Sequence, residues 1–208
     1  MALWNPRGAR GPQNLSDLDL DVETIHKSLF AAVTDAQLNS KFDSPTAFGH
    51  TMWTRTNRYL REELVPKEWT IRNSKLILRT IHPSKWFAVT ATSASGGVGD
   101  LTAGVQAKNP KGEATRKLIT NNGTIPLVYG MEAVDSFDSA EDEIPTWFLL
   151  YKYTSEGVLS ELSYPISMSG PYVDSWQFRL PVPPVDLGGL SDNSDGPDSG
   201  PDFTIEER

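Results

Sequence analysis

The sequence predicts an α+β fold in which N-terminal amphipathic helices pack on a mainly antiparallel sheet, with one short helix inserted between strands. Two observations lead to this prediction. Up to Leu64, apolar residues recur every three or four positions, which is the spacing of helices with one buried face. From Trp69 onward, β-branched and aromatic residues come in short runs separated by turn residues, which is typical of strands.

Two helices are predicted in the first third of the chain. The first spans about residues 19–39, and acidic residues in its first turn suit the helix dipole. The second starts with Ser44 as its cap and Pro45 in its first position, where a missing N–H costs nothing. Val65 and Pro66 end it, because proline cannot continue a helix.

The rest of the domain is predicted to be a sheet. Turn chemistry falls at Asn73-Ser74 and at 82–84, and three prolines after residue 180 end the last strand. The segment 146–153 is apolar on both faces, which predicts a central strand. The predicted strands are 69–71, 75–81, 85–92, 101–107, 124–129, 146–153, 158–166 and 172–180.

The inserted helix has a competing interpretation. Asn109 and Pro110 resemble a cap followed by a first helical residue, which predicts a helix over 113–120 that Asn122-Gly123 stops. A hairpin through 109–112 fits the same residues. The sequence leaves this choice open.

The predicted domain boundaries enclose residues 16–185 in a single domain. About 170 residues can bury roughly 70% of the surface that the unfolded chain exposes. Residues 1–15 and the acidic tail 186–208 are predicted to be disordered, since they carry too few apolar residues to offset their ordering entropy.

The absence of certain residues and segments predicts the cellular compartment. The chain has no cysteine, which excludes disulfides, thiolate metal sites and cysteine nucleophiles. It shows neither a secretory signal nor an apolar stretch of the ~20 residues that a membrane span needs. We therefore expect a cytoplasmic protein with no membrane association.

Four segments taken together suggest a family. They are Pro-Thr-Ala-Phe (45–48), Asn-Arg-Tyr-Leu-Arg-Glu-Glu-Leu (57–64), Asn-Pro-Lys-Gly-Glu-Ala-Thr-Arg-Lys (109–117) and Trp-Phe-Leu-Leu-Tyr-Lys-Tyr (147–153). Their order over about residues 44–180 resembles a family of small uncharacterised α+β proteins carried on bacterial phage-derived and mobile elements. The resemblance includes no diagnostic motif. It implies a regulatory or accessory role and identifies no site residues.

Charge is segregated along the chain. Residues 44–122 contain twelve Lys or Arg and five Asp or Glu, whereas residues 123–208 contain three and sixteen. Three arginines recur every third position on the second predicted helix and form one stripe. Such a stripe can meet phosphates or an acidic protein. The candidate basic residues are Arg55, Arg58, Arg61, Arg72 and Lys75.

Two facts weigh against a free basic surface. Charge runs usually solubilise a helix face, and here Glu62 and Glu63 are available to pair with the arginines. The pI near 4.9 is also low for a dedicated nucleic-acid-binding protein. We favour the solvated, ion-paired interpretation.

Aromatic residues concentrate in the C-terminal strands. Trp147, Tyr151 and Trp176 form a candidate binding patch if they are exposed together. The alternative is that they belong to the core, where aromatic side chains commonly contribute most of the buried area.

No motif specifies a reaction. The histidines 26, 50 and 82 show no metal-ligand spacing, and the glycine-rich segment 95–100 lacks the lysine of a phosphate-binding loop. Glu161 could join acidic residues 132, 135 and 138 around a cation, near Lys152, but the order of residues typical of nucleases is absent. We predict no catalytic residue, metal or cofactor.

The leading functional prediction is a non-catalytic interaction or regulatory accessory protein whose partner is a protein. One alternative is a nucleic-acid-associated accessory factor that uses the basic stripe. A second is a small hydrolase or nuclease whose site the sequence does not reveal, so enzymatic activity is left open.

Overall fold

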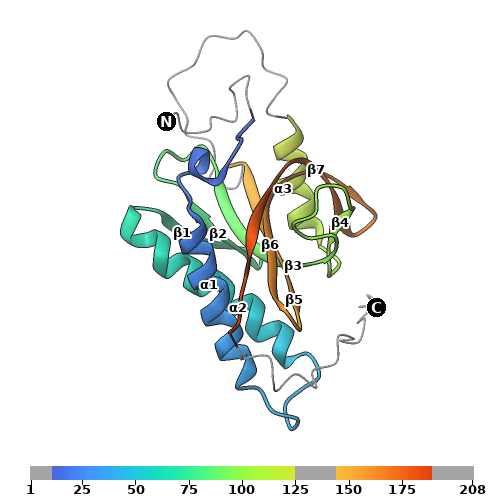
Figure 1. Ribbon diagram of the computed structural model, residues 1–208. Coiled ribbons are helices and arrows are strands. Elements are labelled where there is room, and N and C mark those ends of the chain that lie inside the picture. The colour runs from blue at the N-terminus through green and yellow to red at the C-terminus, as the bar shows by residue number, and fades with distance from the viewer. Residues whose placement is uncertain (1–10, 125–143, 189–208) are drawn as a thin grey trace.

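The computed structural model describes residues 11–124 and 144–188, and this part confirms the α+β prediction (Figure 1). Three α-helices pack with a seven-stranded, mostly antiparallel sheet. In chain order the elements are η1 (Leu15–Leu18), α1 (Val22–Gln37), α2 (Ala47–Leu64), η2 (Val65–Lys67), β1 (Thr70–Ser74), β2 (Ile77–Ile81), β3 (Ala88–Gly96), β4 (Val105–Ala107), α3 (Glu113–Thr124), β5 (Thr146–Thr154), β6 (Gly157–Ser169) and β7 (Tyr172–Val185).

The first helix begins later than residue 19. Asp21 caps it by accepting the Thr24 N–H at 2.6 Å. Before it, η1 is a separate 3-10 turn, capped by Asn14, which ends where Asp19 takes a left-handed conformation. Leu15 is buried, so the ordered chain starts before residue 16.

The second helix begins at Ala47, and the prediction that Ser44 caps it is wrong. Thr46 occupies the cap position without a side-chain hydrogen bond to the helix. The Ser44 hydroxyl lies 2.8 Å from the hydroxyl of Thr46 instead. The predicted end is confirmed, because α2 stops at Leu64 and η2 carries the proline.

The segment after residue 109 is a helix, not a hairpin. It begins at Glu113, where the Gly112 carbonyl accepts the N–H groups of Thr115 and Arg116, so Asn109 and Pro110 do not start it. It continues through Asn122 to Thr124. The rest of the predicted strand 124–129 lies outside the described residues.

The strands follow the order β1-β2-β3-β5-β6-β7, and β4 pairs with β3. The β3–β5 pair is parallel and the other pairs are antiparallel. Because β5 occupies one edge of β3, both β2 and β4 use the other edge. Between them, the Asn57 side chain of α2 donates to the Ala91 carbonyl at 3.1 Å and accepts the Ala91 N–H at 3.0 Å. Both backbone groups of Ala91, which lies between the β2 and β4 pairings on this edge of β3, are therefore bonded.

Two strand boundaries differ from the prediction. The β1–β2 turn is formed by Lys75 and Leu76, both with positive φ, rather than by Asn73-Ser74. Two positive φ angles suit a tight hairpin turn. The last strand, β7, continues through three prolines to Val185. It is an edge strand, where a missing N–H is tolerated.

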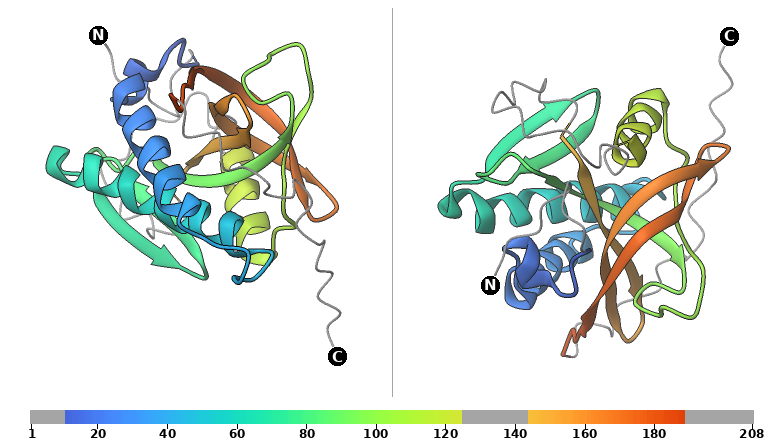
Figure 2. Two further views of the ribbon diagram at one scale, coloured as in Figure 1. Left: turned by 60° about the horizontal axis from the view of Figure 1, so that its bottom comes forward. Right: turned by 90° about the horizontal axis from the view of Figure 1, so that it is seen from above.

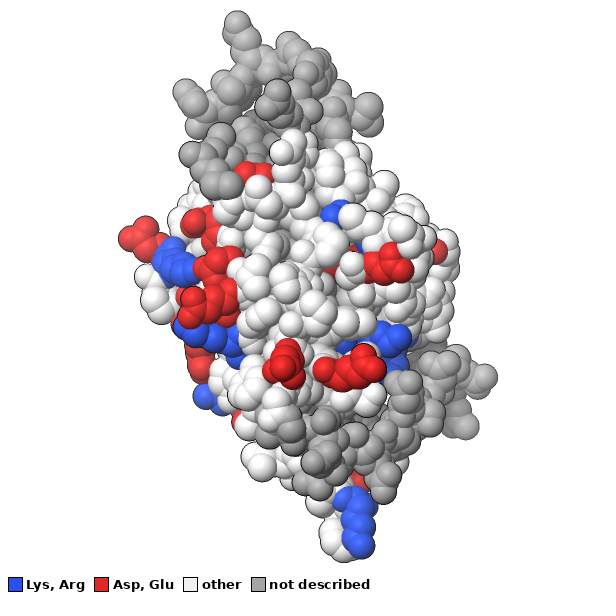
Figure 3. Space-filling view, viewed as in Figure 1, with Lys and Arg blue, Asp and Glu red and all other residues white. Residues whose placement is uncertain are grey.

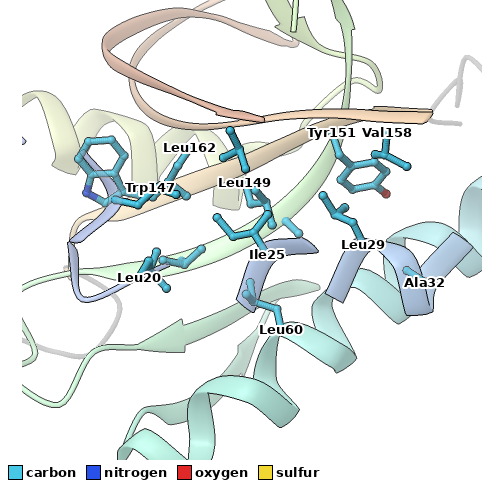
Figure 4. Close-up of a cluster of buried hydrophobic side chains, with 14 of the residues drawn as sticks. Leu20, Ile25, Leu29, Ala32, Leu60, Trp147, Leu149, Tyr151, Val158 and Leu162 are labelled. Atoms are coloured by element: carbon cyan, nitrogen blue, oxygen red, sulfur yellow. The ribbon is translucent and has the colours of Figure 1, made fainter. Parts of the chain in front are cut away.

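The two faces of the sheet are covered by different helices (Figure 2). The larger apolar cluster lies between the sheet and helices α1 and α2, and includes Trp147 and Leu149 (Figure 4). The smaller cluster lies on the α3 side and includes Phe148 and Leu150. Successive residues of β5 thus enter opposite clusters, and its predicted central position is confirmed.

The ordered chain extends beyond the predicted C-terminal boundary of the domain. Leu187 is buried, so the ordered chain passes residue 185. Residues 1–10 and 189–208, which hold most of the two segments predicted to be disordered, lie outside the described residues. Among the described helices, none combines the length and the apolar character that crossing a bilayer requires.

Candidate binding surface

The arginines of α2 do not form a free basic stripe. Arg55 pairs with Asp35 of α1 at 2.9 Å, and Arg58 pairs with Glu62 one turn later at 2.7 Å. On the face shown in Figure 3, basic side chains lie beside acidic ones rather than in a field of one sign. The ion-paired interpretation is therefore correct for these two residues.

Arg61 turns toward the sheet instead of toward solvent. Its Nη2 donates to Asn73 Oδ1 of β1 at 2.7 Å and to the Arg79 carbonyl of β2 at 3.4 Å. Burial lowers the pKa of its guanidinium. Arg61 therefore fixes α2 to the β1–β2 hairpin, and the prediction of one continuous stripe fails.

The two remaining basic candidates lie on that hairpin. Arg72 is the middle residue of β1 and Lys75 begins the turn, and both are exposed. Two large apolar side chains are exposed beside them, since Ile71 is 48% and Leu76 is 87% accessible. The hairpin therefore combines exposed apolar and basic side chains, and we define β1, the turn and β2 as the hairpin surface.

The outer side of β1 is an open sheet edge. Within residues 11–124 and 144–188, β1 pairs with β2 alone, and four of its five residues are exposed. Edge strands present backbone N–H and C=O groups that can pair with another chain. This edge could therefore accept a further strand.

The opposite edge strand, β7, is partly covered by β4. Near its start, Trp176 Nε1 donates to the Val105 carbonyl at 2.9 Å, and Arg179 Nη1 donates to the Ala103 carbonyl at 2.8 Å. These bonds hold β4 and the loop before it against β7. Further along, the strand loses N–H donors at residues 181, 183 and 184, which are prolines.

The predicted aromatic patch does not exist. Trp147 and Tyr151 are 0% and 2% accessible and belong to the cluster under α1 and α2 (Figure 4). Trp176 is half-buried and packs with the cluster on the other face. Trp147 and Tyr151 lie on one face of the sheet and Trp176 packs on the opposite face, so the three residues do not share one surface.

His82 lies in a buried polar cluster that the sequence did not indicate. Its Nδ1 is 2.8 Å from Ser84 Oγ and accepts the Ser84 N–H at 3.1 Å, while Nε2 lies 3.5 Å from Asp19 Oδ2. Trp69 packs edge-on against the ring and Phe87 stacks on it. Burial lowers the pKa of His82, and Asp19 opposes part of this effect. The neutral imidazole accepts the Ser84 N–H, so the cluster closes the β2–β3 turn.

Glu161 is fully buried and is not a metal ligand in this arrangement. Arg179 binds its two oxygens at 2.8 and 2.7 Å, and Ser163 and the Gly99 N–H donate to it at 2.6 and 2.7 Å. Burial alone would raise the pKa of Glu161, but these hydrogen bonds outweigh it and leave the pKa below its usual value. Acidic residues 132, 135 and 138 lie outside the described residues, and Lys152 is half-buried.

The same ion pair fixes the glycine-rich segment. Arg179 Nη2 donates to the carbonyls of Gly97 and Asp100, and the Gly97 N–H bonds the Gly104 carbonyl. The Gly99 N–H is taken by Glu161. The N–H groups of Gly97 and Gly99 are therefore bonded within the protein, and the segment connects β3 to β4.

Lys111 is the second charged group on the α3 side. Its Nζ donates to the Thr92 hydroxyl at 2.8 Å, and burial lowers its pKa to about 8. The other two histidines have ordinary surroundings, since His26 contacts the Pro183 carbonyl and His50 is exposed near Trp53. Across the described ranges, no three His, Cys, Asp or Glu side chains gather as they would around a metal.

The pairs Glu161–Arg179 and His82–Asp19 join residues far apart in sequence, and no local motif indicates them. Glu161 and Arg179 look like isolated strand residues, and nothing near His82 points to Asp19. Comparison of the chain with family models, with curated proteins and with solved structures gave no match.

Proposed function

We propose that the protein is a non-catalytic accessory module that binds another protein through the hairpin surface. The observation that carries this proposal is the contrast between the two sheet edges. β7 is partly covered by β4 and carries three prolines, whereas β1, among the described residues, pairs with β2 alone and is flanked by the exposed side chains of Ile71 and Leu76. Exposed apolar residues rimmed by charge are typical of protein-binding sites.

The structure lends less support to the nucleic-acid alternative. Two of the three helix arginines are engaged by carboxylates, and the third is tied to β1. A partner encoded close to this protein on a mobile element is the setting that the family resemblance implies.

The experiment uses a photo-cross-linking amino acid at Leu76, with Leu38 as the matched control. Leu38 is 81% accessible but lies at the end of α1, away from the sheet edge. We expect one host protein to be cross-linked from position 76 and not from position 38.

The captured protein is then purified, and its dissociation constant is measured. Leu76→Lys should weaken binding by about tenfold or more, as expected for a buried contact at an interface. Leu38→Lys should leave the affinity unchanged. Equal cross-linking from both positions, or equal affinity of both variants, contradicts the proposal.

A further inference from the structure

We infer that the β1–β2 hairpin is an acid-sensitive unit, in which protonation of His82 loosens the joint that holds the hairpin to β3. This inference goes beyond the proposed function, because it concerns how the hairpin is held and requires no partner. His82 is the residue that follows β2 and starts the turn leading to β3.

The His82 side chain occupies the joint between the hairpin and the rest of the sheet. The centre of its ring lies 4.8 Å from that of Trp69, which precedes β1, and 4.8 Å from that of Phe87, which precedes β3. The His82 side chain is 7% accessible, so the imidazole is held almost entirely out of solvent. Movement of the hairpin away from β3 separates these rings and exposes the imidazole to water.

The turn after His82 requires the neutral form of the imidazole. Nδ1 accepts the Ser84 N–H at 3.1 Å, which requires a lone pair on that nitrogen. Protonation places a second donor there, so the Ser84 N–H loses its acceptor, although the Ser84 hydroxyl at 2.8 Å can accept from the protonated ring. The same turn holds Lys85 at a φ of 57°, a left-handed conformation that costs free energy in a residue with a side chain. The imidazole therefore stabilises a turn that is unfavourable by itself.

Asp19 is the described charged group that favours the imidazolium. It lies between η1 and α1, and its Oδ2 is 3.5 Å from Nε2 of His82, which is too far for a strong hydrogen bond. The Asp19 side chain is 63% accessible, so water screens its charge. In the turn itself, Lys85 is exposed and bonds to the His82 carbonyl through its backbone N–H. Burial outweighs Asp19 and keeps the pKa of His82 below the 6.5 of a solvated histidine.

The junction that His82 supports is short. β2 and β3 share two aligned residue pairs, and the His82 N–H then donates to the Phe87 carbonyl at 3.0 Å, directly before the turn. On the other side of the hairpin, the Arg61 side chain bonds to β1 and β2 from α2. With so few bonds at the junction, loss of the Ser84 interaction removes a substantial part of what keeps it closed.

The sign of the pH dependence follows from the proton affinities of the two states. The open state exposes His82 to water and binds a proton near pH 6.5, whereas the closed state binds it at a lower pH. Above pH 6.5 neither state is protonated, and His82 contributes fully to closure. As the pH falls below 6.5, the equilibrium constant for opening rises by up to about tenfold per pH unit, until the closed state is protonated as well. The hairpin surface lies on the opened unit, so acid would also weaken the binding of a partner there, a consequence that rests on the proposed function.

The test is amide hydrogen exchange of the full chain at about pH 7.5 and about pH 5.5. The rates are compared as protection factors, so that the pH dependence of chemical exchange cancels. We expect the protection of residues 70–81 to be about threefold or more lower at the acid pH. His82→Gln, whose side chain does not titrate, should lose most of this difference. His50→Gln replaces an exposed histidine of α2 and should behave as the wild type.

A second variant, Asp19→Asn, keeps the ring and removes the carboxylate. Asparagine tolerates the left-handed φ of 51° at this position. Without the carboxylate the closed state should bind the proton at a still lower pH, so the acid-induced loss of protection should exceed that of the wild type. An NMR titration of the His82 ring in the wild type and in this variant measures the same shift, even if His82→Gln does not fold.

Three results would overturn the inference. They are equal protection of residues 70–81 at both pH values in the wild type, the same pH dependence in His82→Gln as in the wild type, and a His82 ring that titrates at or above pH 6.5. Because these measurements use no partner, their outcome is independent of the cross-linking from Leu76 that tests the proposed function.

Discussion

The face of the sheet that packs against α1 and α2 buries an almost wholly apolar cluster, whereas the face under α3 buries an ion pair and a lysine amine. The two faces share β5, whose neighbouring residues Leu149 and Leu150 are equally buried on opposite sides. The comparison shows that a single sheet can be stabilised by packing on one face and by a satisfied polar network on the other. The polar face should therefore be the more sensitive to loss of one partner.

The largest effect is expected for Glu161→Gln. The change leaves the half-buried Arg179 without its carboxylate, and breaking a buried pair from one side costs about 3–5 kcal/mol. Urea denaturation measures the loss. Glu156→Gln, in the exposed β5–β6 turn, is the control and should change the free energy of unfolding by less than about 0.5 kcal/mol. A loss below about 1 kcal/mol for Glu161→Gln would mean that the ion pair does not hold this face.

An intermediate effect is expected for the two buried asparagines, one on each face. Asn122 of α3 donates to the Thr146 and Pro165 carbonyls and accepts the Thr146 N–H, so it joins α3 to β5 and β6. Asn57 makes two such bonds to the sheet, both to Ala91, and a third to the Trp53 carbonyl of its own helix. Each change to alanine should cost about 1–3 kcal/mol, because buried backbone groups lose their partners.

Asn122→Ala should be the more costly of the two, since three backbone groups of the sheet lose their partner rather than two. Thermal and urea unfolding of both variants rank them. Asn109→Ala, on the surface, is the control. If Asn57→Ala proved the more costly, the stability of the face under α1 and α2 would depend on the Asn57 hydrogen bonds more than on its apolar packing.

The smallest effect, and the one of opposite sign, is expected for Lys111→Met. Burial holds the amine at a pKa of about 8, against 10.5 in an unfolded chain, so at neutral pH the buried charge reduces stability. Methionine removes this cost but also the bond to Thr92, which leaves a gain of about 1 kcal/mol.

The pH dependence of the wild type distinguishes this cause from simple packing. Between pH 8 and 10.5 the unfolded chain holds the Lys111 proton more tightly than the folded chain, so stability should rise with pH in that range. The difference between wild type and Lys111→Met should therefore shrink over the same range. If the difference in unfolding free energy between the two proteins did not change with pH, the gain from Lys111→Met would come from side-chain packing and not from the buried charge.

Periodicity predicted much of the fold. The spacing of apolar residues located α1 and α2 to within a few residues, and the two-sided apolar character of 146–153 placed β5 inside the sheet. These features are local, because a helix face or a strand alternation is written in consecutive residues. The caps were less accurate, since Ser44 and Asn109 satisfy the rules for a cap without forming one.

The candidate sites could not be predicted in the same way. The three-residue spacing of the α2 arginines is visible in sequence, but the carboxylate that pairs with Arg55 comes from Asp35 on another helix. The alternation of aromatic residues does not reveal which face is covered, and here both are. The open edge follows from strand order, which depends on contacts between distant segments.

The junction between β2 and β3 has a consequence for dynamics. These strands share just two aligned residue pairs, Thr80 with Val89 and Ile81 with Ala88. Further along the same edge of β3, the side chain of Asn57 bonds to Ala91 in place of a strand. Because few ladder bonds bind the hairpin to the rest of the sheet, we expect it to open locally as a unit while the domain stays folded. Its amide protons should exchange with solvent by local opening, well ahead of those in β5.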